Sequence, residues 1–297
     1  DGNYPTGTHN VALGDTALDD GSLSGASNTA IGSNVLSENE GGTRNTGVGH
    51  NALAANTSGN YNVAVGYTAL DTNTTGASNV AIGDSSLTAN TTASYNTAVG
   101  YRSLAANTTG ATNVAVGGDS MLANTTGSNN VSMGVGAMVA NTTGGNNVAI
   151  GRQALDANTT ASNNTAVGYQ SLTANTTGPR NVAVGYEAAK SNTTGDAGTA
   201  LGYEALRTNT TGNYNTAVGK GALYGNTTAD SNSALGFNAL AANTTASNNT
   251  AVGYQALTAN TTGGNNAAFG YGALDANTTG AHNTGLGVNA LGANTTS

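Results

Sequence analysis

The sequence has few of the residues from which a globular core is usually built. Among its 297 residues there are two phenylalanines, two prolines and no tryptophan, and aromatic residues make up 5% of the chain. There is no cysteine, which excludes disulfide bonds and thiolate metal sites. Disordered chains are usually rich in charge and proline, yet only 7% of these residues are charged. The composition therefore fits neither a conventional globular domain nor a disordered tail.

Basic residues are especially scarce. Seven lysines and arginines stand against fifteen aspartates and glutamates, which gives a net charge of -8, and the seven do not cluster. This argues against a surface for nucleic acid or for an anionic membrane. No apolar run approaches the roughly 18 residues that a membrane-spanning helix needs. We therefore expect no nucleic-acid partner and no membrane insertion.

Glycine is abundant, and it returns at a fixed interval. A glycine occurs every 17 residues from Gly32 to Gly287, and the first interval, from Gly14 to Gly32, is 18 residues. So short a period is typical of a solenoid in which one repeat forms one coil. The sequence predicts an all-β fold, a parallel β-solenoid (β-roll or β-helix) of about 17 coils.

The repeat can be numbered from this glycine as position 0. Position -1 is always large and apolar, position -3 is mostly Val or Thr, and position -2 is Ala, Gly or Ser. This alternation predicts a short strand that ends at the glycine. We expect positions -1 and -3 to face the core together with the leucine row at +4, and the small residue at -2 to face outward. Charged residues, which gather at +1, +2, +5 and in the turn at +10 to +12, should be wet.

The regularity of the repeat suggests two parts. Residues 1–45 hold irregular N-terminal coils, a candidate partial cap, and residues 46–297 form one continuous, regular solenoid. The chain begins and stops within a turn of the repeat. We expect either neighbouring domains or end-to-end stacking of copies, since open β-edges need protection.

Asparagine forms two rows, at -4 and at +7. Stacked amides can hydrogen-bond along a solenoid as a ladder, which we favour for the -4 row. The +7 row also opens an Asn-Thr-Thr or Asn-Thr-Ser sequon in every coil from Asn56 onward. N-glycosylation there is an alternative to a buried ladder, although sugars every roughly 4.8 Å would be crowded. The candidate glycosylation sites are Asn56, Asn73, Asn90, Asn107, Asn124, Asn141, Asn158, Asn175, Asn192, Asn209, Asn226, Asn243, Asn260, Asn277 and Asn294.

The phrase Asn-(Val/Thr)-Ala-(Val/Ile)-Gly with a small residue three positions on, as in residues 62–69, resembles a known repeat. It is similar to the head repeats of YadA-like trimeric autotransporter adhesins and to related repeats of phage tail fibres, over residues 10–297. The resemblance implies a left-handed parallel β-roll, three associated chains and an extracellular or virion-surface location. The repeat here is longer than the family's, by the Leu-x-Ala-Asn-Thr-Thr segment.

Self-association has a second argument in the -2 row. A ladder of Ala, Gly and Ser on the face opposite the core would be flat enough for another backbone to approach closely. The alternative is a solvent-facing alanine row, which is ordinary on protein surfaces.

Few residues point to chemistry. Glu187 and Glu204 occupy +2 in adjacent coils, and paired carboxylates at such a separation serve retaining glycosidases. The alternative, which we favour, is two solvated glutamates compensated by Lys190 and Arg207. The three histidines lie in widely separated coils, so a metal or triad site is unexpected. We expect no enzyme, no cofactor and no metal.

Aromatic residues form runs at position +1. Such rows stabilise solenoids by stacking, and they can also hold surface glycans. The candidate glycan-stacking residues are Tyr169, Tyr186, Tyr203, Phe237, Tyr254 and Tyr271.

The sequence as a whole predicts a non-catalytic structural fibre or adhesin shaft, extracellular and self-associating as a trimer or an end-to-end filament. The alternative is a ligand-binding solenoid with a repetitive face for ice or glycans. Against ice, the adjacent threonines at +8 and +9 would face opposite ways in a regular strand.

Overall fold

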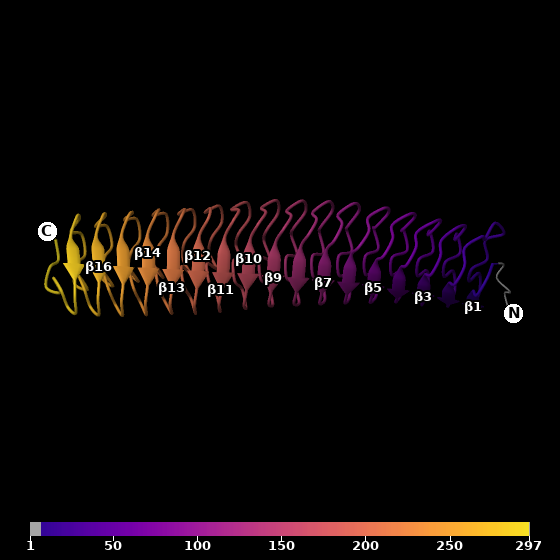
Figure 1. Ribbon diagram of the computed structural model, residues 1–297, viewed down its shortest axis with the longest axis horizontal. Helices are drawn as coiled ribbons and strands as arrows, with labels where there is room; N and C mark the ends of the chain where they lie inside the picture. Colours follow the sequence, from indigo (N-terminus) through magenta and orange to yellow (C-terminus); the bar gives the residue numbers. More distant parts are fainter. Residues whose placement is uncertain (1–6, 297) are drawn as a thin grey trace. The chain divides into compact units, whose positions relative to one another are not determined.

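The computed structural model describes residues 7–296 and confirms the predicted parallel β-solenoid, with one three-residue strand per repeat (Figure 1). Within that range we find no helix with the length and apolarity that crossing a bilayer requires. The strands are β1 (Val11–Leu13), β2 (Thr29–Ile31), β3 (Thr46–Val48), β4 (Val63–Val65), β5 (Val80–Ile82), β6 (Thr97–Val99), β7 (Val114–Val116), β8 (Val131–Met133), β9 (Val148–Ile150), β10 (Thr165–Val167), β11 (Val182–Val184), β12 (Thr199–Leu201), β13 (Thr216–Val218), β14 (Ser233–Leu235), β15 (Thr250–Val252), β16 (Ala267–Phe269) and β17 (Thr284–Leu286).

The chain divides into two compact units at residue 147. The first contains β1 to β8 and the second β9 to β17, and in each unit consecutive strands pair in parallel. The register places equivalent repeat positions opposite one another, for example Thr165 opposite Val182. The predicted boundary at residue 45 falls inside the first unit. Each column of equivalent side chains therefore runs along a unit at the strand spacing of about 4.8 Å.

The strands face the opposite way from the expectation. The small residue at -2 is fully buried in nearly every strand, as at Ala200, whereas the flanking residues at -3 and -1 are half-buried or exposed. Our assignment of -1 and -3 to the core, and of -2 to an outer flank, was wrong. The coil interior is already occupied by leucine at +4, by Ala or Ser at +3 and by two rows of asparagine. What remains beside the strand admits a methyl group and little more.

Two substitutions within the repeat show that positions +3 and -2 meet across this narrow core. Val35 is the one larger residue at +3, and it faces Gly47 at -2 of the next coil, where a Cβ atom would collide with the Val35 side chain. Ser120 and Ser132 occupy the same pair of positions five repeats later, and their hydroxyl oxygens are 2.8 Å apart. A larger side chain at +3 is thus accompanied by a smaller residue at -2, and a polar side chain at +3 by a polar partner at -2.

The leucine row at +4 is buried as predicted, but its backbone is unusual. Leu172, for example, has φ of 50°, in the left-handed region that non-glycine residues rarely adopt. That conformation costs roughly 1–2 kcal/mol per residue. Burying a leucine side chain contributes about 1.5–3 kcal/mol, which offsets the cost and holds the corner in place.

The glycine at position 0 has the positive φ that the sequence predicts, and a second reason to be glycine. At Gly185 φ is 142°, and a Cβ atom would lie 2.7 Å from the carbonyl carbon of Gly202 in the next coil. Stacked coils come so close at this corner that no side chain fits between them. The 17-residue period therefore records both a backbone conformation and a steric limit.

Candidate functional site

Apolar side chains are exposed along the outer face of the parallel sheet in each unit. We define the outer sheet face as the side chains at -3 and -1. In the second unit its -1 column consists of Ile150, Val167, Val184, Leu201, Val218, Leu235, Val252, Phe269 and Leu286, of which Leu201 is 36% and Leu235 50% exposed. Single apolar residues on a surface are ordinary, but a continuous patch marks a binding surface.

The outer sheet face is regular as well as apolar. Because the parallel strands pair position for position, Val, Ile and Leu of successive coils stand in one column and the Thr and Val residues at -3 in another. The first unit has the same two columns from β1 to β8. Each unit thus offers a repeating surface in which any strand presents nearly the same chemistry as its neighbours.

The asparagines lie inside the coils, where they form a hydrogen-bonded spine. We define the asparagine spine as the rows at -4 and +7. At +7, Nδ2 of Asn226 donates to Oδ1 of Asn209 at 2.8 Å and to the carbonyl oxygen of Ala229 at 3.1 Å. The predicted ladder at -4 is confirmed in a modified form, since its Oδ1 accepts a backbone N–H. Oδ1 of Asn215, for example, accepts from the N–H of Asn232.

The two rows share an acceptor. In the coil that contains Gly195, the carbonyl oxygen of this residue at +10 accepts from Nδ2 of Asn181 at -4 and of Asn192 at +7. Both asparagines are almost completely buried. The amide groups therefore hydrogen-bond to one another and to the turn.

This burial bears on the sequons. From Asn56 to Asn277 the +7 asparagines are at most 2% exposed, and their Nδ2 atoms, to which a glycan would attach, hydrogen-bond within the spine. A glycosylated amide would have to leave the spine. Glycosylation stays a prediction, and in this structure it would require a coil that never closed.

The aromatic residues at +1 stack on one another. Ring centroids of Tyr169, Tyr186 and Tyr203 are 5.3 and 5.1 Å apart in sequence order, with interplanar angles of 15° and 9°. Phe237, Tyr254 and Tyr271 form a second stack with centroids 5.1 Å apart. Their faces cover each other, so the exposed parts are mainly ring edges. Glycan stacking on these rings stays a prediction.

Lys220 lies between the two stacks and contacts a ring of each. It occupies +1 in the coil between them, and its Nζ lies 5.5 Å from the Tyr203 ring centroid and 5.8 Å from that of Phe237. A cation between two aromatic faces is attracted by both ring quadrupoles. The +1 column of the second unit is therefore an unbroken stack from Tyr169 to Tyr271.

The paired glutamates form an ion-pair cluster. Glu187 accepts from Nζ of Lys190 at 2.8 Å and from Nε of Arg207 at 2.7 Å, and Arg207 also lies 3.5 Å from Glu204. Our expectation that Glu187 is exposed to solvent was wrong, because its side chain is only 8% exposed. The hydrogen bond from Lys190, with that from Arg207, lowers the pKa of Glu187 despite burial. A general acid would need a raised pKa.

Other chemistry-bearing side chains do not converge. Within residues 7–296 no three His, Asp or Glu side chains are grouped so as to hold a metal ion. His50 stacks on Tyr67 with ring centroids 5.4 Å apart. This stack joins two neighbouring coils and stabilises their packing.

The comparisons with known proteins identify no relative. No family model, no curated protein and no solved structure matches this chain. The resemblance to YadA-like head repeats accordingly stays a prediction. The outer sheet face was missed because the alternation in the strand was assigned by side-chain size. The coupled changes at Val35 and Gly47, and at Ser120 and Ser132, are a signal in the sequence that would have placed -2 inside.

Proposed function

We propose that the protein is a non-catalytic structural shaft, extracellular or on a virion or cell surface, whose chains associate side by side through the outer sheet face. The observation that carries the proposal is the continuous apolar column at -1, flanked by Thr and Val at -3. A second copy that presents the same columns covers them at matching intervals. Three copies, as the resemblance to trimeric adhesins implies, would place three such faces around one axis.

Because the -2 row is buried, another chain cannot pack against it. The outer sheet face is the better candidate for association, because its side chains are larger and more apolar. Burial of apolar surface contributes about 25 cal/mol per Å². Because the column extends along each unit, its contribution grows with every coil that pairs, which suits a stiff shaft.

The test is the molar mass in solution, measured by light scattering after size-exclusion chromatography. We expect a multiple of the 28.8 kDa chain mass. Val184→Lys with Leu201→Lys places charges on the outer sheet face and should return the mass to that of one chain. The matched control, Thr177→Lys with Thr194→Lys, alters the exposed +9 positions of the Asn-Thr-Thr turns and should leave the assembly intact. A monomeric wild-type chain at all concentrations would contradict the proposal.

A second candidate function is a repetitive ligand-binding face, for ice or glycans. One observation favours ice: threonine recurs at -3 on the same exposed face as the apolar column, as at Thr199 and Thr216. Thermal hysteresis of the wild-type protein, lost in the double-lysine variant of the outer sheet face, would support ice binding. The absence of thermal hysteresis from concentrated wild-type protein would remove ice as the ligand of this face.

Glycosylation of the +7 sequons is tested by the intact mass. A fully folded asparagine spine predicts agreement with 28.8 kDa for protein from a glycosylating source. A heavier chain whose added mass maps to the +7 asparagines in peptide fragments would show that these sequons are modified before the coils close.

A further inference from the structure

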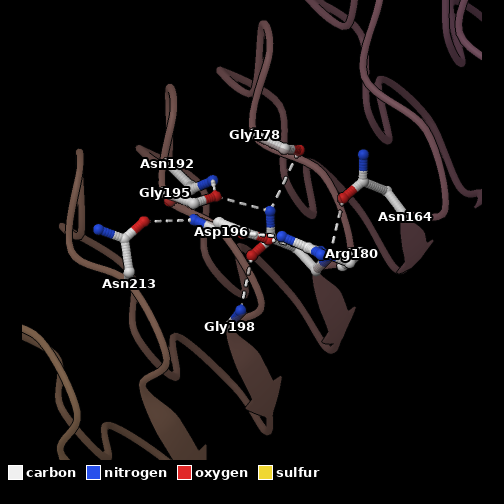
Figure 2. A network of polar contacts seen from close by, with 9 residues as sticks. Asn164, Gly178, Arg180, Asn192, Gly195, Asp196, Gly198 and Asn213 are labelled. Carbon is white, nitrogen blue, oxygen red and sulfur yellow. Dashed lines mark hydrogen bonds and ion pairs between the residues drawn. The ribbon is translucent and has the colours of Figure 1, made fainter.

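The asparagine spine of the second unit is interrupted once, at Gly198. Position -4 carries asparagine in the neighbouring coils, at Asn181 and Asn215, but glycine here. Gly198 is buried, and its N–H donates to Oδ1 of Asn181 at 2.8 Å, as an asparagine there would (Figure 2). The backbone thus keeps its place in the ladder while the side-chain amide is missing.

The missing amide leaves two backbone groups without the partners that other coils provide. In neighbouring coils, Oδ1 at -4 accepts the N–H of the next -4 residue; among residues 7–296 nothing accepts the N–H of Asn215, although this residue is fully buried. Likewise the +10 carbonyl usually accepts two amides, but that of Gly212 accepts only Nδ2 of Asn209 within the described chain. An unpaired buried N–H costs about 1–3 kcal/mol.

The place of the missing side chain is bordered by three groups. A Cβ atom built on Gly198 would lie 3.1 Å from Oδ1 of Asn181, a tight contact, and at ordinary contact distances of 3.6 Å from Cδ2 of Leu206 and 3.9 Å from the carbonyl oxygen of Asn215. Among the described residues, and apart from the two chain neighbours of Gly198, no backbone atom lies closer than 3.4 Å to this Cβ position, so the coil has not closed over it. The ion pair between Arg180 and Asp196 lies in the same network, and the N–H of Asp196 is fixed by Oδ1 of Asn213 (Figure 2).

We propose that this gap is a binding site for one internal water molecule, which stands in for the amide of asparagine. The water oxygen accepts a hydrogen bond from the N–H of Asn215. Its two hydrogens are donated to the carbonyl oxygen of Gly212 and to the remaining lone pair of Asn181 Oδ1. Buried waters typically make about three hydrogen bonds to groups that lack protein partners. A neutral guest with one acceptor and two donors suits the site, whereas an ion would find no opposite charge among these three groups.

Crystal structures of the full wild-type chain and of Gly198→Asn, at a resolution that shows ordered water, test the proposal. We expect one isolated density peak within hydrogen-bonding distance of Asn215 N and Gly212 O in the wild type. In the variant the side-chain amide should replace it. An empty wild-type gap, or a coil in which a protein group accepts the N–H of Asn215, would overturn the proposal.

A solution measurement gives an independent readout. In water-exchange NMR, the N–H of Asn215 should show a direct cross-peak to a long-lived water in the wild type and lose it in Gly198→Asn. The N–H of Asn232, which Oδ1 of Asn215 accepts at 3.0 Å, is the matched control and should show none in either protein. Equal water contact at both amides, or none at Asn215, contradicts an internal water at this position.

Discussion

The asparagine spine and the outer sheet face distribute polarity in the reverse of the usual order. The spine places amides where almost no solvent reaches, and the outer face places Val, Ile and Leu where solvent does. The spine is stable inside because each amide finds its partners in its own coil and in the neighbouring one. The outer face leaves its apolar side chains exposed in the single chain. Burial in this fold follows the geometry of stacking more closely than it follows hydropathy.

The largest effect is expected from exchanging polarity between the two regions. Asn226→Leu removes the hydrogen bonds to Asn209 and Ala229 and the one accepted from Asn243. Because the partners stay buried, we expect a loss of about 3 kcal/mol or more in the free energy of unfolding. Urea denaturation followed by circular dichroism measures it.

The reciprocal exchange is the control. Leu235→Asn puts an amide on the outer sheet face, where the leucine is 50% exposed. In dilute, monomeric protein it should cost less than about 1 kcal/mol. If the leucine variant in the spine proved the milder of the two, the buried amides would not be what holds the coils together.

A smaller effect on stability is expected from changing side chains on the two faces of one strand, β12. Ala200→Val adds two methyl groups to a fully buried position and should destabilise by about 1–3 kcal/mol. Thr199→Val, next to it on the outer sheet face, should change stability by no more than about 0.5 kcal/mol. Equal thermal midpoints for the two variants would contradict the assignment of -2 to the core.

The smallest effect concerns pH. Since the ion pairs lower the pKa of Glu187 from its ordinary 4.5, this group stabilises the fold above that value, and the contribution is lost as pH falls through the lower folded pKa. Glu187→Gln should therefore cost about 1 kcal/mol at pH 7 and progressively less in acid. Thermal midpoints measured between pH 7 and pH 3 give the slope.

Asp71 provides a control of opposite sign. Desolvation raises its pKa from the ordinary 3.8, so its charged form destabilises the fold at pH 7 and this penalty disappears as pH falls toward 3.8. Asp71→Asn should raise the thermal midpoint slightly at pH 7 and not at pH 3. A Glu187→Gln difference that did not shrink in acid would show that packing, and not charge, carries the cluster.

Much of the fold could be predicted from the sequence. The glycine interval, the short alternating run and the leucine row at +4 predict the period, the strand and one wall of the core, because each follows from local geometry. The asparagine rows predict a ladder for the same reason. The mode of bonding at -4, where Oδ1 accepts a backbone N–H, could not be read from composition.

The side of the strand that faces inward could not be predicted from alternation alone. Alternation shows that two faces differ, and large residues are usually the buried ones. Here leucine at +4 and the asparagine spine fill the coil before the strand does, so only Ala, Gly or Ser fits at -2. The burial of Glu187 was missed because its partners, Lys190 and Arg207, lie on two different coils.

The most direct test of the account is the reactivity of single cysteines, which the cysteine-free chain permits without background. Ala200→Cys and Leu201→Cys are compared by maleimide labelling over a range of protein concentrations, with denatured protein as the reference for equal intrinsic reactivity. We predict that position 200 is protected at every concentration, and that position 201 reacts in dilute protein and becomes protected as chains associate. Faster labelling at position 200 than at position 201 would contradict the account.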